Sequence, residues 1–342
     1  MYKFELFDVN SVDVAEYEHY EHKNLFTTIS WLKYLREWKK VEPIIVRITS
    51  EDDDALVGHF TGCLFKKFGF KILGSPFYGW MGQHMGFDFE NHTTVNKSIV
   101  LDEVISYLRR QKVMSFLIFA DFQYTEQDIE LCKTKLFHND IRGSYFLDLT
   151  QSEEQIFKNF KSGYRTCVRK FEKLGGTIVE EWSDTFMEEH HAQLAEVFER
   201  KNMTSPNYRS RLYLLHEMNP EIILPIKALD ENGNNIASSF YFYGGGLAFF
   251  QSNASYTKAL SYNANQALMW YAIKYFKNKG IKSLDMAGRA AYKENFGPVL
   301  KNTPSTVWTK YVLLWRSIAF ARKLYYSSFR IKYKVGKFIK RK

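Results

Sequence analysis

Residues 247–287, LAFFQSNASYTKALSYNANQALMWYAIKYFKNKGIKSLDMA, decide the fold class of this chain. Leu247 to Ser252 is a short apolar run that is typical of a buried strand. Between Asn263 and Lys279 apolar residues recur at helical spacing, and Asn263 with Gln266 predicts a capping box at the helix start. Ser283 to Ala287 predicts another buried strand. A strand, a long helix and a strand in this order predict an α/β architecture.

The same order of elements occurs in both halves of the chain. Each half has a strand, an acidic turn and a second strand, at 43–49, 51–54 and 55–65 and again at 222–229, 230–233 and 236–243. In the first half a helix at 98–112 and a strand at 114–120 follow. We therefore predict two similar α/β domains with mixed sheets flanked by helices, residues 1–150 and 151–321, and a separate C-terminal tail, residues 322–342.

The net charge of +9 comes from the tail alone. Residues 322–342 contain nine Lys or Arg and no acid, which leaves 38 basic and 38 acidic residues in the rest of the chain. A neutral body excludes a basic coat of the ribosomal-protein kind, and 45% hydrophobic residues exclude bulk disorder. The tail could form a basic amphipathic segment on an anionic membrane, hold the phosphates of a tRNA, or be an ordinary solvated end.

The chain has the character of a reduced, cytoplasmic protein. No signal peptide is visible at MYKFELFDVN, and the longest apolar runs fall far short of the ~20 residues that a membrane-spanning helix needs. The three cysteines, Cys63, Cys132 and Cys167, are too widely spaced for a zinc knuckle or a disulfide framework. We expect a cytoplasmic location, with peripheral attachment to the inner membrane face if the tail binds lipid.

Common catalytic motifs are absent. The sequence has no G-x-S-x-G, no phosphate-binding G-x-x-x-x-G-K-[ST] and no H-E-x-x-H. His190 and His191 are adjacent, so on a helix they point about 100° apart and do not form the i,i+4 pair that binds one metal. We therefore expect no metal and no tightly bound cofactor.

Two segments carry candidate chemistry. Ser152 with Gln155 predicts the start of one long helix that continues to Gly175, on which Lys161, Arg165 and Arg169 are spaced i, i+4, i+8. These cations could clamp phosphates or carboxylates, or they could be an ordinary solvated helix face. The residues 285–298, DMAGRAAYKENFGP, place a carboxylate, Asp285, at a strand end and Lys293 just beyond it, where a lysine could hold an oxyanion. The alternative is a surface turn.

Together these motifs resemble the Fem family, peptidyltransferases that build peptidoglycan cross-bridges on a doubled fold like that of the acyl-CoA N-acyltransferase (GNAT) superfamily. The resemblance rests on the order of RTCVRKFEKLG (165–175), ASY (254–256), LMWYAI (268–273), GIKSLDMAG (280–288) and YKENFG (292–297). In the first half, TTISWLKYL (27–35) and GSPFYGW (74–80) are similar to the first domain of that family.

The resemblance implies an N-acyltransferase that forms an amide between an activated acyl or aminoacyl donor and an amino group of a cell-envelope precursor, either peptidoglycan or a surface glycan. The donor would be an aminoacyl-tRNA or an acyl-CoA. Lys293 would lie at the reaction centre, with Asp285 orienting it or accepting the amine proton. The implied substrate-binding residues are Arg165, Arg169, Tyr256, Arg289, Tyr292 and Tyr78.

Two departures from the family pattern bear on the substrates. A conventional GNAT protein holds the CoA pyrophosphate on a glycine-rich loop before its helix, but residues 252–264 contain no glycine. Leu35 falls where members that act on nucleotide-linked muropeptides carry a lysine. Alternatives are therefore an acetyl-CoA-dependent N-acetyltransferase of a sugar nucleotide or polysaccharide, and a non-catalytic module that binds an envelope precursor.

Overall fold

The computed structural model describes residues 1–20, 23–67, 70–77, 80, 84–91, 95–119, 127, 130, 131, 138–309, 311–321 and 324. Within these residues the chain divides into two compact units. Unit 1 comprises Met1–Ser144, Gly244–Leu247 and Leu300–Val312, and unit 2 comprises Tyr145–Tyr243, Ala248–Val299 and Leu313–Lys342. Most of the predicted C-terminal tail, residues 322–342, lies outside the described residues, and so does Tyr78, one of the predicted substrate-binding residues.

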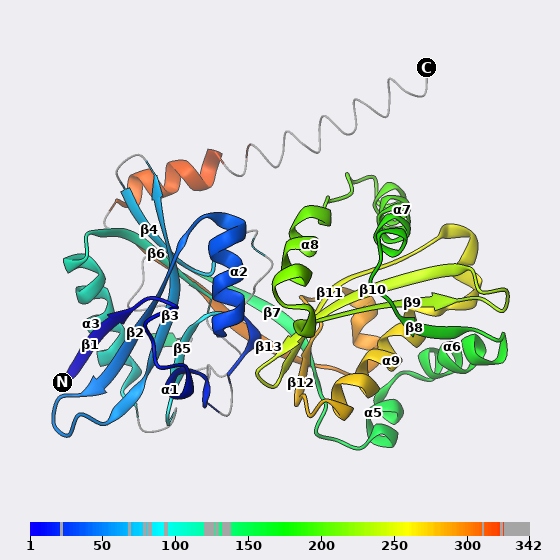
Figure 1. The fold of residues 1–342 in the computed structure, drawn as a ribbon, viewed down its shortest axis with the longest axis horizontal. Helices are drawn as coiled ribbons and strands as arrows, with labels where there is room; N and C mark the ends of the chain where they lie inside the picture. The colour runs from blue at the N-terminus through cyan, green and yellow to red at the C-terminus, as the bar shows by residue number, and fades with distance from the viewer. Residues whose placement is uncertain are drawn as a thin grey trace. The chain divides into compact units, whose positions relative to one another are not determined.

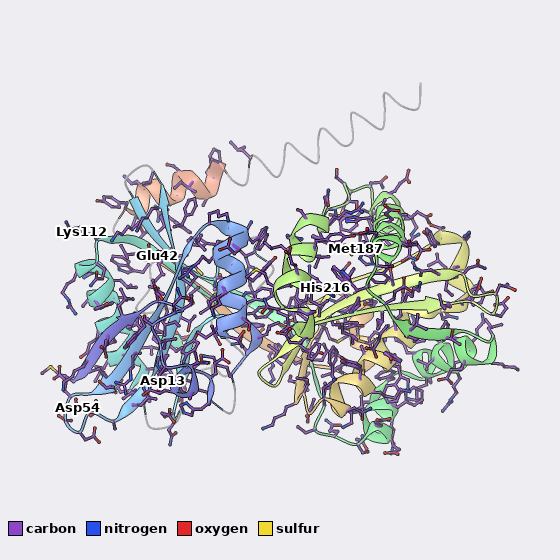
Figure 2. All side chains as sticks on the ribbon, viewed as in Figure 1. Asp13, Glu42, Asp54, Lys112, Met187 and His216 are labelled. Carbon is purple, nitrogen blue, oxygen red and sulfur yellow. The ribbon has the colours of Figure 1, made fainter. Side chains whose placement is uncertain are left out.

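Unit 1 is built on a mixed sheet. Its strands run in the order β1 (Tyr2–Phe7), β2 (Glu42–Ser50), β3 (Leu56–Lys67), β4 (Phe70–Ser75), β6 (Val113–Phe119) and β13 (Val299–Thr309). A further strand, β5 (Gly86–Phe89), pairs with β3. β4 lies parallel to β6, whereas β13 pairs with β6 in the antiparallel sense. The predicted hairpin is confirmed as β2 and β3, and Asp54 at its tip has a φ of 55° (Figure 2).

Helices α1 (Val14–Glu18), α2 (Ile29–Lys39) and α3 (Lys97–Arg110) accompany this sheet, with a short 3-10 helix, η1 (Leu25–Thr27), before α2. α3 buries Val100, Val104 and Leu108 in the same core cluster as Ile44, Val46 and Ile48 of β2 and Trp308 of β13. Burying aliphatic and aromatic side chains of this size contributes about 1.5–3 kcal/mol each, so the helix face and the sheet stabilise one another.

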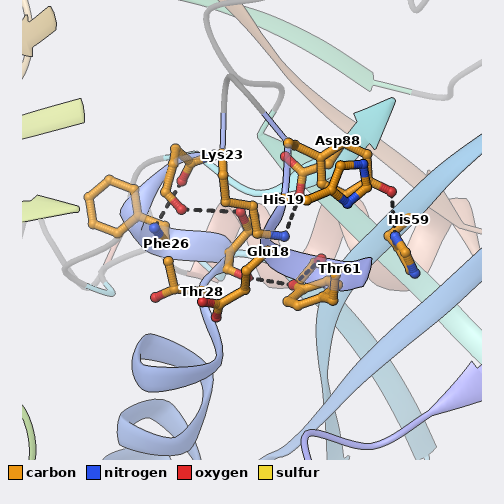
Figure 3. A network of polar contacts seen from close by, with 12 residues as sticks. Glu18, His19, Lys23, Phe26, Thr28, His59, Thr61 and Asp88 are labelled. Atoms are coloured by element: carbon orange, nitrogen blue, oxygen red, sulfur yellow. Dashed lines mark hydrogen bonds and ion pairs between the residues drawn. The ribbon is translucent and has the colours of Figure 1, made fainter. Parts of the chain in front are cut away.

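A buried polar network joins the start of this helical region to the sheet of unit 1 (Figure 3). Lys23 donates a 2.8 Å bond to Asp88, and its ammonium lies 3.3 Å from the centre of the Tyr17 ring. The Tyr20 hydroxyl contacts Nδ1 of His59, whose pKa burial lowers to about 4. A buried charge is stable only when it is paired, so Lys23 and Asp88 each depend on the other.

The strands of unit 2 have helices on both faces (Figure 1). The strand order is the end of β7 (His138–Asp148), β12 (Ser283–Asp285), β11 (Leu247–Ser255), β10 (Asn235–Gly244), β9 (Ile223–Leu229) and β8 (Thr177–Glu180). α5 (Glu153–Asn159), α6 (Ser162–Lys173) and α9 (Ala264–Asn278) pack with one core cluster of this sheet. α7 (Asp184–Arg200) contributes Phe186 and His190, which contact Phe240.

The remaining elements of the second half are short. α8 (Arg209–Met218) follows α7, and the 3-10 helices are η2 (Pro220–Ile222), η3 (Thr257–Tyr262) and η4 (Ala291–Phe296). Residues 312–321 are helical, and so is Leu324. None of the helices within the described residues is long and apolar enough to cross a membrane.

One sequence prediction about these helices is wrong. The single helix expected from Ser152 to Gly175 is two helices, α5 and α6, because Phe160 adopts an extended conformation with ψ of 140°. The predicted cap is confirmed, since Ser152 accepts a bond from the Gln155 amide. Phe160 is fully buried between the rings of Trp270 and Phe296, and this packing outweighs the helical periodicity of the local sequence.

Candidate active site

The strongest candidate site is a cavity of about 270 Å³ in unit 2, where β11 ends and α9 begins. One wall is apolar and aromatic, and it comprises Tyr164, Phe250, Leu260, Met269, Tyr292 and Phe296. A second wall carries short polar side chains, which are Asn253, Ser255, Asn265 and Gln266. Val197, Arg200 and Lys201, near the end of α7, complete the lining. An apolar cavity with a few convergent polar groups is the usual form of a small-ligand site.

The regular alternation of side chains between the two faces of β11 is interrupted, so both apolar and polar residues of this strand line the cavity. Phe250 packs on Tyr241, whose hydroxyl contacts Met269 of α9, so Phe250 faces α9. Ser252 should share that face in a regular strand, yet its hydroxyl lies 3.0 Å from Nε2 of His190 on α7. Asn253 faces the cavity again. A residue that breaks the two-residue period in this way bends the strand, as bulges near active sites do.

The start of α9 forms the polar side of the cavity. Asn265 donates a 3.3 Å bond to the Ser255 hydroxyl, and its Oδ1 is buried with no hydrogen-bond partner among the described residues. The predicted capping box at Asn263 is wrong, because Asn263 has a left-handed conformation and its side chain caps no amide of α9. Asn265 Oδ1 can therefore accept a hydrogen bond from a bound molecule.

Lys293 lies directly behind the aromatic wall. It is 5% exposed, and its Nζ lies 5.3 Å from the centre of the Phe250 ring and 5.8 Å from that of Tyr292. Nζ donates to the carbonyls of Met286 and Ala287. Burial lowers the pKa of Lys293 to about 8, while Asp285 opposes this shift and Lys201 adds to it.

Asp285 and Lys293 hold the same turn from its two sides. Asp285 is fully buried at the end of β12, and its carboxylate accepts a 2.8 Å bond from the amide of Ala287. Ala287 has a φ of 58°, which a non-glycine residue adopts only when its surroundings enforce it. The structure thus brings the two residues predicted for catalysis to one turn, beside the cavity.

The two arginines predicted to bind substrate lie on α6 and do not line the cavity. Arg165 donates to the carbonyl of Lys158, in the last turn of α5, and to that of Phe160, the C-cap residue of α5. Arg169 is exposed, with its guanidinium 5.6 Å from the centre of the Phe157 ring. Lys161 is the N-cap residue of α6, where its side chain makes no capping hydrogen bond, so it does not continue the row of cations along the helix. A role for the arginines in binding an anionic substrate stays a prediction.

The other predicted residues divide into two groups. Tyr292 lines the cavity, and burial raises the pKa of its hydroxyl to about 12. Tyr256 begins η3 with its ring against the core of unit 2, and Arg289 is exposed beyond β12. Neither of these two lines the cavity.

The sequence reasoning missed the contribution of α7. Arg200 contacts the hydroxyl of Thr257 in η3, and the neighbouring Lys201 is exposed at the cavity. The available signal was the adjacent pair of cations, Arg200 and Lys201, but only the fold places the end of α7 at the cavity.

His190 holds two strands to α7 through hydroxyl groups. Nδ1 lies 2.7 Å from the Ser238 hydroxyl and Nε2 lies 3.0 Å from that of Ser252. Burial lowers the pKa of His190 to about 3, so the imidazole is neutral at physiological pH. No group of three or more metal-ligating side chains occurs within the described residues.

Comparison with known proteins places this cavity in a recognised domain. Residues 158–294 match the family model of the Acetyltransferase (GNAT) domain, which includes every cavity-lining residue except Phe296. No curated protein matches the chain by sequence.

Solved structures resemble the chain along most of its length. The crystal structure of FemX superposes with a TM-score of 0.69 at 10% identity, covering 92% of this chain and 99% of that one. A conserved protein of unknown function from Bacteroides thetaiotaomicron gives a TM-score of 0.57 at 12% identity, over 91% of this chain and 100% of that one. L-PGS from Bacillus licheniformis gives 0.51 at 15% identity, over 85% and 90%. The predicted fold and its likeness to the Fem structures are confirmed.

Proposed function

We propose that this chain is a GNAT-type N-acyltransferase, which forms an amide between an activated acyl or aminoacyl donor and an amine of a cell-envelope precursor. One observation carries the proposal: the cavity lies between the end of β11 and the first turn of α9, inside the residues that match the acetyltransferase domain. The envelope precursor, of peptidoglycan or a surface glycan, is inferred from the Fem-like fold.

The connection between β11 and α9 supports an aminoacyl-tRNA as the donor over acyl-CoA. It is a 3-10 helix, η3, which ends at Asn263 with a φ of 59°, and it contains no glycine. A glycine-free connection does not let backbone amides approach a pyrophosphate closely. Acyl-CoA, with acetyl transfer to a sugar nucleotide or polysaccharide, remains the second candidate.

The reaction needs a group that stabilises the negative oxygen formed when the amine attacks the donor carbonyl. The nitrogen lone pair forms the new C–N bond, the ester or thioester bond breaks with its electrons on the leaving oxygen or sulfur, and the proton that the amine loses ends on that leaving group. An ammonium has three N–H donors, and Lys293 uses two of them on the carbonyls of Met286 and Ala287. We assign the third to the oxyanion, with Asp285 orienting Lys293 through the shared turn.

The test is amide formation in a purified system. The protein is incubated with aminoacyl-tRNA or acetyl-CoA and candidate amines from envelope precursors, and the new amide is detected by mass spectrometry. We expect Lys293→Ala to lower the rate by about 10²–10³, as loss of an oxyanion donor does. Unchanged turnover would remove Lys293 from the mechanism.

A cavity-blocking pair of variants tests the site itself. Asn253→Trp fills the cavity from its polar wall, whereas Asn232→Trp adds the same side chain to the exposed turn between β9 and β10. We expect the first to lower amide formation by about tenfold or more, because a misplaced substrate loses its reactive geometry, and the second to leave it unchanged. Tight precursor binding with no transfer from either donor would instead indicate a binding module.

A further inference from the structure

The helix at residues 312–321, the terminal helix, is apolar except at Arg316 and Ser317. Its sequence is VLLWRSIAFA, and at 100° per residue the apolar side chains cover every direction except those of Arg316 and Ser317. Leu313 is 79% exposed and Phe320 is 64% exposed. The exposed apolar series also includes Tyr311, which precedes the helix, and Leu324, which is itself helical.

Large exposed apolar patches mark surfaces that bind a partner or a membrane. The exposed apolar side chains of the terminal helix, with Leu313 and Phe320 the most exposed, fit insertion into one leaflet of a bilayer.

The charge that follows the terminal helix identifies the partner. Residues 322–342 carry nine basic residues and no acid, and the first two, Arg322 and Lys323, directly follow Ala321 of the terminal helix. Cations next to an apolar helix favour anionic lipid headgroups over neutral ones. A tRNA would match the cations but would leave the apolar side chains of the helix in water.

We propose that the terminal helix inserts into the surface of an anionic membrane. This places the protein on the surface of a bilayer. The proposal does not depend on acyl transfer, because lipid binding is measured with no donor or acceptor present.

The test uses the full chain and two matched double variants. Leu313→Asp with Phe320→Asp puts two charges on the exposed face of the terminal helix. Val14→Asp with Met203→Asp puts the same two charges on exposed apolar residues elsewhere. Each protein is sedimented with vesicles of phosphatidylcholine alone and of phosphatidylcholine with phosphatidylglycerol, and its circular dichroism and thermal unfolding are compared with wild type.

We expect the wild type and the Val14/Met203 variant to bind the anionic vesicles, and the Leu313/Phe320 variant to bind at least tenfold more weakly. Binding should also weaken as salt rises, because the Debye length falls from ~10 Å at 0.1 M to ~3 Å at 1 M. Wild type that stays in the supernatant, or equal binding by the two double variants, would overturn the proposal. Binding to tRNA without binding to vesicles would overturn it as well.

Discussion

The environment of Lys293 links stability to the candidate chemistry at a single residue. Its ammonium is enclosed by the carbonyls of Met286 and Ala287 and by the rings of Phe250 and Tyr292. Because burial disfavours the charged form, the pKa falls from 10.5 to about 8. A lysine whose pKa lies near neutrality can both donate a hydrogen bond and release a proton within the pH range in which an enzyme works.

This pKa predicts how stability changes with pH. Between pH 8 and 10.5 the unfolded chain binds the Lys293 proton and the folded chain has released it, so the free energy of unfolding rises with pH across that window. Below pH 8 this stabilising contribution is lost, because folding must then bury the charged ammonium of Lys293. The Lys293→Met variant has no titrating group at this position. Relative to it, the free energy of unfolding of the wild type should rise by up to about 3 kcal/mol between pH 8 and 10.5.

Urea unfolding of both proteins from pH 7 to 10.5 measures this difference. A difference between the two free energies that stays constant with pH would show that Lys293 keeps an ordinary pKa in the folded protein.

Among the helices and strands, the junction of α5 and α6 shows how tertiary contacts change a predicted element. The amide of Lys161 donates a 2.8 Å bond to the carbonyl of Asn295 in η4. Gly297, which follows η4, has a φ of 71° and packs closely against the end of α5. A Cβ added to it would lie 2.5 Å from the carbonyl oxygen of Asn159. The junction and the segment that carries Lys293 are therefore packed as one body.

Arg165 should stabilise this junction. It caps the end of α5 by donating to two carbonyls, so Arg165→Met should lower the free energy of unfolding by about 1–2 kcal/mol. The control is Arg169→Met, on the same helix. In the described structure the Arg169 guanidinium contacts only the Phe157 ring, so this variant should lower the free energy of unfolding by about 0.5 kcal/mol.

Chemical denaturation and steady-state kinetics separate the two roles of Arg165. A loss of kcat/KM in Arg165→Met with no loss of stability would contradict the capping role and favour the predicted contact with an anionic substrate.

In the whole molecule, the last strand returns to the first unit. β13 pairs with β6, and Trp308 of β13 joins the core of unit 1 and lies under the guanidinium of Arg109 at 4.9 Å. Residues 300–312 consequently belong to unit 1, although they follow the second half of the sequence. Unit 1 is incomplete without them.

Truncation tests this dependence. A fragment of residues 1–144 lacks β13, so it should fail to unfold cooperatively in urea and should be digested rapidly by protease, because an open sheet edge and core are exposed. A chain of residues 1–321 keeps β13 and serves as the control, which should unfold as the full chain does. Cooperative unfolding of the 1–144 fragment would show that β13 is dispensable for unit 1.

How far the sequence predicted this protein depends on the range of the interactions involved. The hairpin of β2 and β3, the helices α3 and α9, and the cap at Ser152 were predicted correctly, because periodicity, turn residues and local hydrogen bonds determine them. The break at Phe160 was not, because rings distant in sequence cause it. The conformation of Asn263 was missed for a related reason, since η3 precedes it in place of an ordinary cap.

The sequence by itself determined the α/β class, the repeated order of elements and the concentration of charge in the tail, since each of these is a pattern along the chain. Only the tertiary structure decided which residues meet. It enclosed Lys293 and Asp285 at one turn, opened the cavity between β11 and α9, engaged Arg165 in capping α5, and returned β13 to unit 1. The physical reason is that burial and packing join residues far apart in sequence, and their pKa values and partners depend on those neighbours.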